Sequence, residues 1–154
     1  MNIKISPNHI IISFFLAIFF QLSFGQTQPI DKKIESLSLK LRQHSRNIDS
    51  LEFYANTLYK YAVKKNDTRL TINALMSLSR VEIRKGDLQK SNAINHQVIQ
   101  LANKNKIQDF AYRAMNNLAL NHRRLRRNDS AFYYFKKLNQ YYTKNNITMP
   151  AAQV

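Results

Sequence analysis

The sequence contains no cysteine and no tryptophan, and it has few residues that interrupt helices. Without thiols, neither a disulfide bond nor a thiolate metal site can form, so helix packing must supply the stability. Between Asp31 and Met149 there is no proline, and Gly86 is the single glycine. Because these two residue types are the main helix breakers, and because no strand-like alternation is visible, we expect this segment to be almost continuously helical.

Acidic residues are also scarce, with nine Asp and Glu against 24 Lys and Arg and a formal net charge of +15. Basic surfaces attract anionic partners, which include nucleic acid, acidic proteins and anionic lipid headgroups. General solvation of the surface explains many of these lysines equally well. The net charge therefore favours an anionic partner but does not indicate which of these classes it belongs to.

The N-terminus predicts export. A polar start containing Lys4 precedes an apolar stretch over 10–20, and the small residues Ser23 and Gly25 precede a cut that would leave Gln26 first. This pattern is typical of a secretory signal peptide, here over 1–25, and implies a periplasmic protein. An uncleaved membrane anchor is the alternative, although the apolar stretch is shorter than the roughly 18 residues that a spanning helix needs.

Six helices are expected after a short linker over 26–30. Apolar residues recur at helical spacing, as in Leu51, Tyr54 and Leu58, and clusters of polar turn residues separate the apolar stretches. We expect Asp87 and Asp129 to cap the helices that follow them. The helices are expected at about 31–45, 49–65, 68–85, 88–104, 108–126 and 129–145.

The same segment repeats itself with a period of about 40 residues. Residues 71–110 align with 111–150 without a gap, and 31–70 join them after a one-residue slip in the first half. Leu37, Leu78 and Leu118 then share a column. In the same alignment, 151–154 fall where the first helix of a fourth unit would begin, so we interpret them as the start of a truncated further repeat. This suggests either that the protein is longer or that a partner or a second copy covers the exposed end of the last repeat.

The third unit resembles the tetratricopeptide repeat (TPR) family. It carries that family's small, large and turn residues at Ala114, Asn117-Leu118-Ala119, His122, Asp129-Ser130-Ala131 and Phe135. The resemblance is to an extended bacterial form of about 40 residues and implies an all-α solenoid of antiparallel helix pairs. It implies three units, 31–70, 71–110 and 111–150, with small columns at Ser38/Ser79/Ala119 and Ser91/Ala131 where helices approach closely.

In this family the first helix of each pair lines a concave groove. Mapped by register, the groove would hold Arg and Asn side chains that suit the carboxylates of an acidic peptide. The residues are Asn73, Met76, Ser77, Arg80, Arg84, Arg113, Asn116, Asn117, Leu120, Arg123 and Arg124. If the double substitution Arg113→Glu/Arg123→Glu left partner binding unchanged, the assignment of these residues to a binding groove would be wrong.

The last predicted helix is rich in aromatic residues. A terminal repeat exposes the surface on which a further unit would pack. We therefore expect a repeat-end interface, open to self-association, at Phe132, Tyr133, Tyr141 and Tyr142.

No constellation for chemistry emerges. His44, His96 and His122 lie in separate helices without the spacing of metal ligands, and we expect the first two to face solvent and His122 to pack. One glycine cannot build a phosphate-binding loop. We therefore predict no catalytic residues, metal or cofactor, and a protein that is not an enzyme.

These observations favour an exported module for protein–protein interaction. By resemblance, we expect the sensory or scaffold N-terminal region of a bacterial signalling protein, of the histidine kinase or helix-turn-helix regulator type. One alternative is a free periplasmic adaptor in envelope assembly or secretion. Another is a basic nucleic-acid-binding repeat protein, which would require the signal peptide to be misread.

Overall fold

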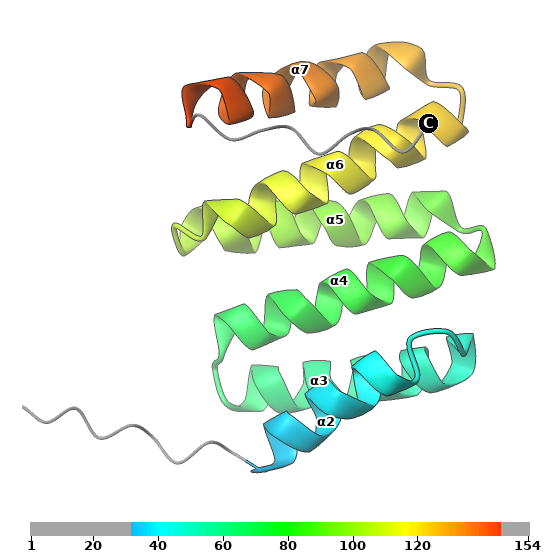
Figure 1. The fold of residues 1–154 in the computed structure, drawn as a ribbon, viewed down its shortest axis with the longest axis vertical. Coiled ribbons are helices and arrows are strands. Elements are labelled where there is room, and N and C mark those ends of the chain that lie inside the picture. Colours follow the sequence, from blue (N-terminus) through cyan, green and yellow to red (C-terminus); the bar gives the residue numbers. More distant parts are fainter. Residues whose placement is uncertain (1–31, 146–154) are drawn as a thin grey trace, which may run out of the picture. The chain divides into compact units, whose positions relative to one another are not determined.

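The computed structural model describes residues 32–145, and these form six α-helices (Figure 1). Their bounds are α2 (Lys32–Gln43), α3 (Ile48–Lys64), α4 (Thr68–Lys85), α5 (Leu88–Lys104), α6 (Gln108–Arg124) and α7 (Asn128–Lys144). Each expected helix is present within two residues of its predicted bounds. The expected signal peptide, linker and truncated further repeat lie outside the described residues.

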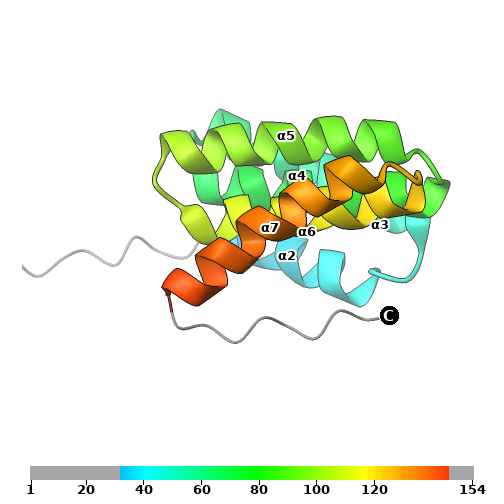
Figure 2. The same cartoon turned by 90° about the horizontal axis from the view of Figure 1, so that it is seen from above.

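The helices form a solenoid in which consecutive helices pack side by side from α3 to α7, and α4 also contacts α6. Connecting turns alternate between two opposite edges of the array (Figures 1 and 2). Neighbouring helices are therefore antiparallel, while α2, α4 and α6 run in the same direction. The prediction of an all-α solenoid is confirmed, with no strand in residues 32–145.

The turns repeat with half the period of the sequence. Asn66, Gly86, Lys106 and Arg126, spaced 20 residues apart, all have positive φ, between 53° and 85°. The residue after each one donates its N–H to a carbonyl five residues back, as Asp67 does to Ala62 at 3.0 Å. This arrangement ends a helix by satisfying its last free carbonyls, and it reverses the chain in a very short turn.

The turn between α2 and α3 is the exception. It spans four residues, 44–47, whereas the other turns span two or three. It contains no residue with positive φ. The greater length of this turn accounts for the one-residue slip in the first half of the first unit.

Three helices begin with a side-chain cap. Asn47, Asp67 and Asp87 each accept a hydrogen bond from the N–H three residues later, at 2.8, 2.9 and 2.9 Å. The expected cap at Asp87 is confirmed, but the expected cap at Asp129 is wrong. Helix α7 begins one residue earlier than predicted, so Asp129 lies in its first turn and the capping position is Arg127, without a side-chain hydrogen bond. The Asp129 carboxylate still suits the positive end of the helix dipole.

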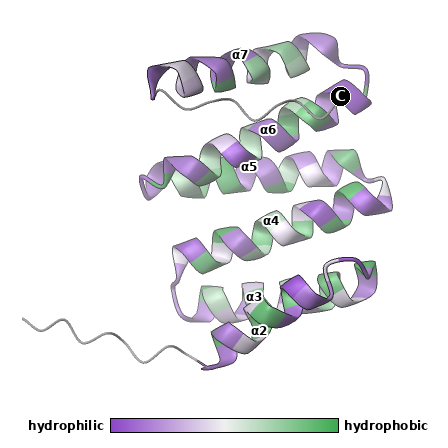
Figure 3. Cartoon of the chain, viewed as in Figure 1, coloured by the Kyte–Doolittle hydropathy of each residue, from purple (hydrophilic) through white to green (hydrophobic). Residues whose placement is uncertain are grey.

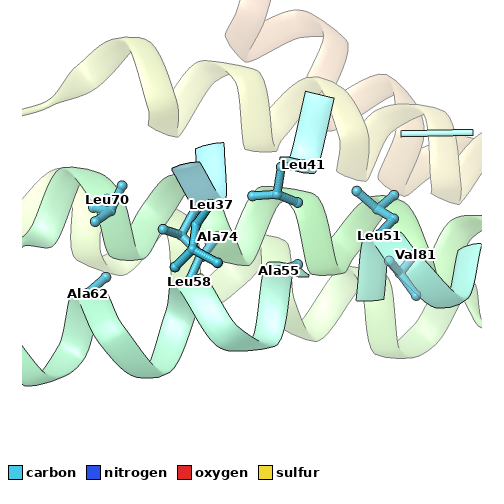
Figure 4. Packing of buried hydrophobic residues seen from close by; sticks show 9 residues of the cluster. All are labelled: Leu37, Leu41, Leu51, Ala55, Leu58, Ala62, Leu70, Ala74 and Val81. Carbon is cyan, nitrogen blue, oxygen red and sulfur yellow. The ribbon is translucent and has the colours of Figure 1, made fainter. Parts of the chain in front are cut away.

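Two apolar clusters in the described part of the chain are each shared by three consecutive helices, and further buried residues, such as Leu118 of α6 and Leu138 of α7, lie outside them. In the first, Leu37 and Leu41 of α2 pack with residues of α3 and α4 (Figure 4). The second joins α4, α5 and α6 around Ile72, Val98 and Phe110. Every helix carries both apolar and polar residues (Figure 3) because only the side that meets its neighbours is buried.

A buried polar ladder lies beside these clusters and ties α4, α5 and α6 together. It comprises Ser79, Ser91, Asn92, Asn95, Asn117 and Asn121. The hydroxyl oxygens of Ser79 and Ser91 lie 2.9 Å apart, and both residues are fully buried. The close approach of helices expected at these small residues is thus confirmed, and a hydrogen bond accompanies it.

Candidate functional site

The predicted groove residues form matching stripes on two parallel helices. On α4, Asn73, Ser77, Arg80 and Arg84 are spaced so that they lie on one face. On α6 the equivalent positions, 40 residues later, are Arg113, Asn117, Leu120 and Arg124. All four arginines in these stripes are exposed, whereas Ser77, Asn117 and Leu120 are half-buried.

A cavity of about 360 Å³ opens at the α2 side of the α4 stripe. Arg42 of α2 and Arg80 of α4 line it, together with Ser45 and Ser77. Leu41 and Leu51 supply its apolar lining. Arginine and serine side chains that line one cavity can bind a carboxylate through charge-assisted hydrogen bonds, and the apolar lining suits an adjacent aliphatic chain.

Two of the predicted arginines already have partners within the fold. Arg84 donates a hydrogen bond to the carbonyl oxygen of Ser45 in the α2–α3 turn. The guanidinium of Arg113 lies over the ring of Phe110, 5.6 Å from its centroid, and Arg69 approaches the same ring at 5.5 Å. Arg84 therefore fixes one wall of the cavity, while Arg80 is the α4 arginine that lines it.

The structure does not bring all the predicted residues together. Arg113 and Arg123 are ten residues apart on α6, which separates them by about 15 Å along the helix axis. Arg113 and Asn73 occupy equivalent positions toward one end of the groove, and Arg84 and Arg124 toward the other. Met76 packs against the second apolar cluster, and Asn116 and Arg123 lie exposed on α6.

Asn117 connects the groove to the polar ladder. Its Nδ2 atom donates to Oδ1 of the buried Asn95 at 3.2 Å, while the residue itself is half-buried. Asn95 donates in turn to Ser79 Oγ and to the carbonyl oxygen of Ser91. The ladder therefore fixes the orientation of a side chain on the groove surface.

The ladder also leaves one acceptor unsatisfied. Asn121 is 1% exposed and donates to both Ser91 and Asn92 at 2.9 Å. Its Oδ1 atom has no hydrogen-bond partner within the described part of the chain. A buried acceptor without a partner is costly, so this end of the ladder is its weakest point.

The predicted repeat-end residues divide into two groups. Phe132 and Tyr133 are exposed at 69% and 52%, and Lys137 lies over the Tyr133 ring at 4.5 Å. Tyr141 instead stacks on Tyr112 of α6, with ring centroids 3.3 Å apart, and Tyr142 packs edge-on against it. The outward aromatic surface of α7 is therefore confined to its N-terminal half.

Histidine and tyrosine side chains gather where α6 turns into α7. His122 stacks on Tyr134 with ring centroids 5.7 Å apart, and His96 tilts toward the same ring at 6.3 Å. Burial, aided by the charges of Arg127 and His96, lowers the pKa of His122. Burial also raises the pKa of Tyr134. The expected packing of His122 is confirmed, and both His44 and His96 are exposed.

Within 32–145 no three His, Asp or Glu side chains are grouped as metal ligands would be. In the same part of the chain, no helix combines the length and apolar character needed to cross a bilayer.

Residues of the cavity wall were missing from the sequence prediction. Arg42 and Ser45 flank the irregular first turn, where the repeat register slips. The sequence held one indication of Arg42. When the repeats are aligned with the one-residue slip, Arg42 falls in the same column as Arg123, a predicted groove residue. Asn95 and Asn121 were also missed, since asparagine on a helix usually indicates the solvent side.

Comparison with known proteins returned no matching family model, no similar curated protein and no similar solved structure.

Proposed function

We propose that this chain is an exported protein-interaction module whose groove binds an acidic segment of a partner protein. The observation that carries the proposal is the cavity shared by Arg42 and Arg80. The groove helices carry further exposed arginines at Arg84 on α4 and Arg124 on α6. A partner that presents two or more carboxylates along an extended segment would meet several of these groups in turn.

The proposal places the repeats in the tetratricopeptide class. Its support is the regular pairing of antiparallel helices and the return of the same turn every 20 residues. Within that class we favour the sensory or scaffold region of a bacterial signalling protein, after the predicted signal peptide over 1–25. A free periplasmic adaptor is the second candidate, and the outward aromatic pair Phe132 and Tyr133 supports it as a site of assembly.

Site-specific cross-linking tests this proposal. A photoreactive residue at Asn116, exposed on the groove face of α6, should capture a protein partner in the envelope fraction. The matched control is the same residue at Gln97, exposed on α5, which belongs to the second helix of a pair. The adduct at Asn116 should weaken as salt rises, because screening weakens exposed charge pairs. Equal adducts at both positions would contradict a groove-directed partner.

Sequencing the DNA downstream of the codon for Val154 separates the two candidates. A further run of repeats, an apolar segment of about 20 residues and an output domain would support the signalling protein. A stop codon there would favour the free adaptor.

A further inference from the structure

A larger cavity, which we name the α6–α7 cavity, lies between the last two helices. Its volume is about 500 Å³, within the range of about 300–1,000 Å³ that is typical of small-molecule sites. Tyr112 and Met115 of α6 line one side. The lining residues of α7 are Lys137, Gln140, Tyr141, Lys144 and Asn145. None of these residues is acidic.

The first unit contains an equivalent cavity of about 510 Å³ between α2 and α3. Its α3 lining residues are Thr57, Lys60, Tyr61, Lys64 and Lys65, and each lies two repeat periods before a lining residue of α7. The cavity therefore follows from the way in which the two helices of a unit pack. The side chains then decide what each cavity can hold.

Aromatic and thioether groups distinguish the α6–α7 cavity. Tyr112 and Tyr141 stack with their ring centroids 3.3 Å apart and their planes inclined by 18°, and both are half-buried. Met115 lies three residues after Tyr112 and therefore on the same side of α6. Aromatic rings pack well on one another in offset or edge-on contacts, and the methionine sulfur also contacts them favourably. This wall suits a planar aromatic ring.

Lysine and amide side chains supply the polar part of the lining. Lys137 and Lys144 are exposed and lie seven residues apart on one face of α7, about 10.5 Å along its axis, a gap that two lysine side chains can span. Lys144 forms no ion pair with any residue in 32–145. Lys137 lies over the exposed Tyr133 ring at 4.5 Å, which is a weak contact at such a position. Lysine is a common ligand of phosphate groups, which it binds as a point charge.

The two amides add hydrogen-bonding groups of both kinds. Asn145 donates through Nδ2 to the carbonyl oxygen of Tyr141 at 2.7 Å, and its Oδ1 atom can accept. Gln140 is exposed and can both donate and accept. A heterocyclic ring that carries donors and acceptors on its edge complements these groups better than a plain hydrocarbon ring does.

We propose that the α6–α7 cavity binds a mononucleotide, that is, a planar heterocycle joined through a sugar to a phosphate group. The heterocycle packs on the wall of Tyr112, Met115 and Tyr141, and the phosphate binds Lys137 and Lys144. The first-unit cavity is a weaker candidate, because Lys33 and Lys65 lie over its Tyr61 ring at 5.1 and 5.6 Å and it lacks amide side chains.

This site is separate from the cavity of Arg42 and Arg80, which is formed by α2, α3, α4 and the α2–α3 turn. Mononucleotide binding therefore goes beyond the acidic-partner proposal. Either proposal can fail while the other stands.

Methyl NMR of the full chain labelled at methionine tests mononucleotide binding. Met115 lines the α6–α7 cavity, whereas Met76 packs against the second apolar cluster and serves as an internal reference. Adenosine monophosphate (AMP) is titrated beside adenosine, which lacks the phosphate, and ribose phosphate, which lacks the heterocycle. We expect AMP to shift the Met115 methyl signal saturably and to leave Met76 unchanged. Each fragment should bind at least about tenfold more weakly, because it lacks either the charged or the stacking contact.

A pair of matched variants locates the phosphate contact. Lys137→Gln/Lys144→Gln should weaken AMP binding at least about tenfold. Lys60→Gln/Lys64→Gln removes the same charge from the equivalent cavity and should change the Met115 titration by less than about threefold. Circular dichroism should show unchanged helix content in both variants.

Three results would overturn the proposal. The first is a Met115 methyl signal that AMP leaves unmoved up to millimolar concentrations. The second is ribose phosphate that binds as tightly as AMP, which would indicate a general anion site. The third is an equal loss in the Lys60→Gln/Lys64→Gln control, which would indicate a general charge effect. The first two results need only the wild-type chain, so a variant that failed to fold would not prevent the test.

Discussion

Replacing Asn95 with alanine is expected to lower the free energy of unfolding substantially, because Asn95 is the centre of the polar ladder. Its side chain is fully buried. Its Nδ2 atom lies 2.8 Å from Ser79 Oγ and 2.9 Å from the carbonyl oxygen of Ser91, while Oδ1 accepts from Asn117 at 3.2 Å. The substitution removes these three hydrogen bonds, together with a longer one of 3.3 Å to Ser91 Oγ, and leaves a small void between α4, α5 and α6.

The magnitude follows from these contacts. Two buried hydrogen bonds and the half-buried one from Asn117, at about 1 kcal/mol each, give about 3 kcal/mol. The better helix propensity of alanine returns about 0.6 kcal/mol. We therefore expect a net loss of about 2–3 kcal/mol, measured by urea denaturation followed by circular dichroism, and a Tm lower by about 10 °C.

Two comparisons sharpen the experiment. Asn56→Ala changes the same residue type at an exposed position within α3 and should shift the free energy of unfolding by less than about 0.5 kcal/mol. A double-mutant cycle between Asn95→Ala and Ser79→Ala should give a coupling energy of at least about 0.5 kcal/mol, since the two side chains are in contact. If Asn95→Ala were as mild as Asn56→Ala, the ladder would not be a stabilising feature.

Three further predictions concern the turns and the His122 cluster. Gly86→Ala should destabilise by about 1 kcal/mol in urea denaturation, because φ is 85° there although nothing lies within 4 Å of an added Cβ; an unchanged stability would contradict this. Lys106→Gly should instead stabilise by about 0.5–1 kcal/mol in the same assay, because glycine adopts the positive φ of 58° without strain. A decrease in the free energy of unfolding would show that the lysine side chain contributes more to stability than the relief of backbone strain does. The pKa of His122 is lowered from 6.5 in the folded state, so just below pH 6.5 the unfolded chain binds more protons at this residue than the folded chain does. The free energy of unfolding should therefore decrease as the pH is lowered below 6.5. His122→Phe should reduce this slope in urea titrations at several pH values, and an identical slope would assign it to other groups.

The helices could be predicted from the sequence because their signals are local. The near absence of proline and glycine and the helical spacing of apolar residues were enough to place all six. The turns carry local signals too, and the single glycine Gly86 indicated one of them. Asn66, Lys106 and Arg126 occupy the same conformation without glycine, so their identity gave little indication of positive φ.

Side-chain pairing between helices could be predicted only in part. The spacing of Ser91, Asn95, Val98 and Ala102 places Asn95 on the buried stripe of α5. Its burial could therefore be predicted from the sequence, but its hydrogen bonds to other helices could not. What makes a buried asparagine favourable is the pair of serine hydroxyls that α4 and α5 bring together. The cavity of Arg42 and Arg80 arises likewise from the irregular α2–α3 turn, whose path the repeat register does not determine.

A peptide-binding titration tests the central claim that the groove binds an acidic segment through Arg42 and Arg80. Fluorescence anisotropy would follow a labelled glutamate-rich peptide with wild type, with Arg42→Gln/Arg80→Gln, and with Lys104→Gln/Lys106→Gln as the control of equal charge. We predict that the arginine pair weakens binding at least about tenfold, since each charge-assisted hydrogen bond contributes about 1.5–3 kcal/mol. The lysine pair should change binding by less than about threefold. Equal weakening by both variants, or none by either, would contradict the claim.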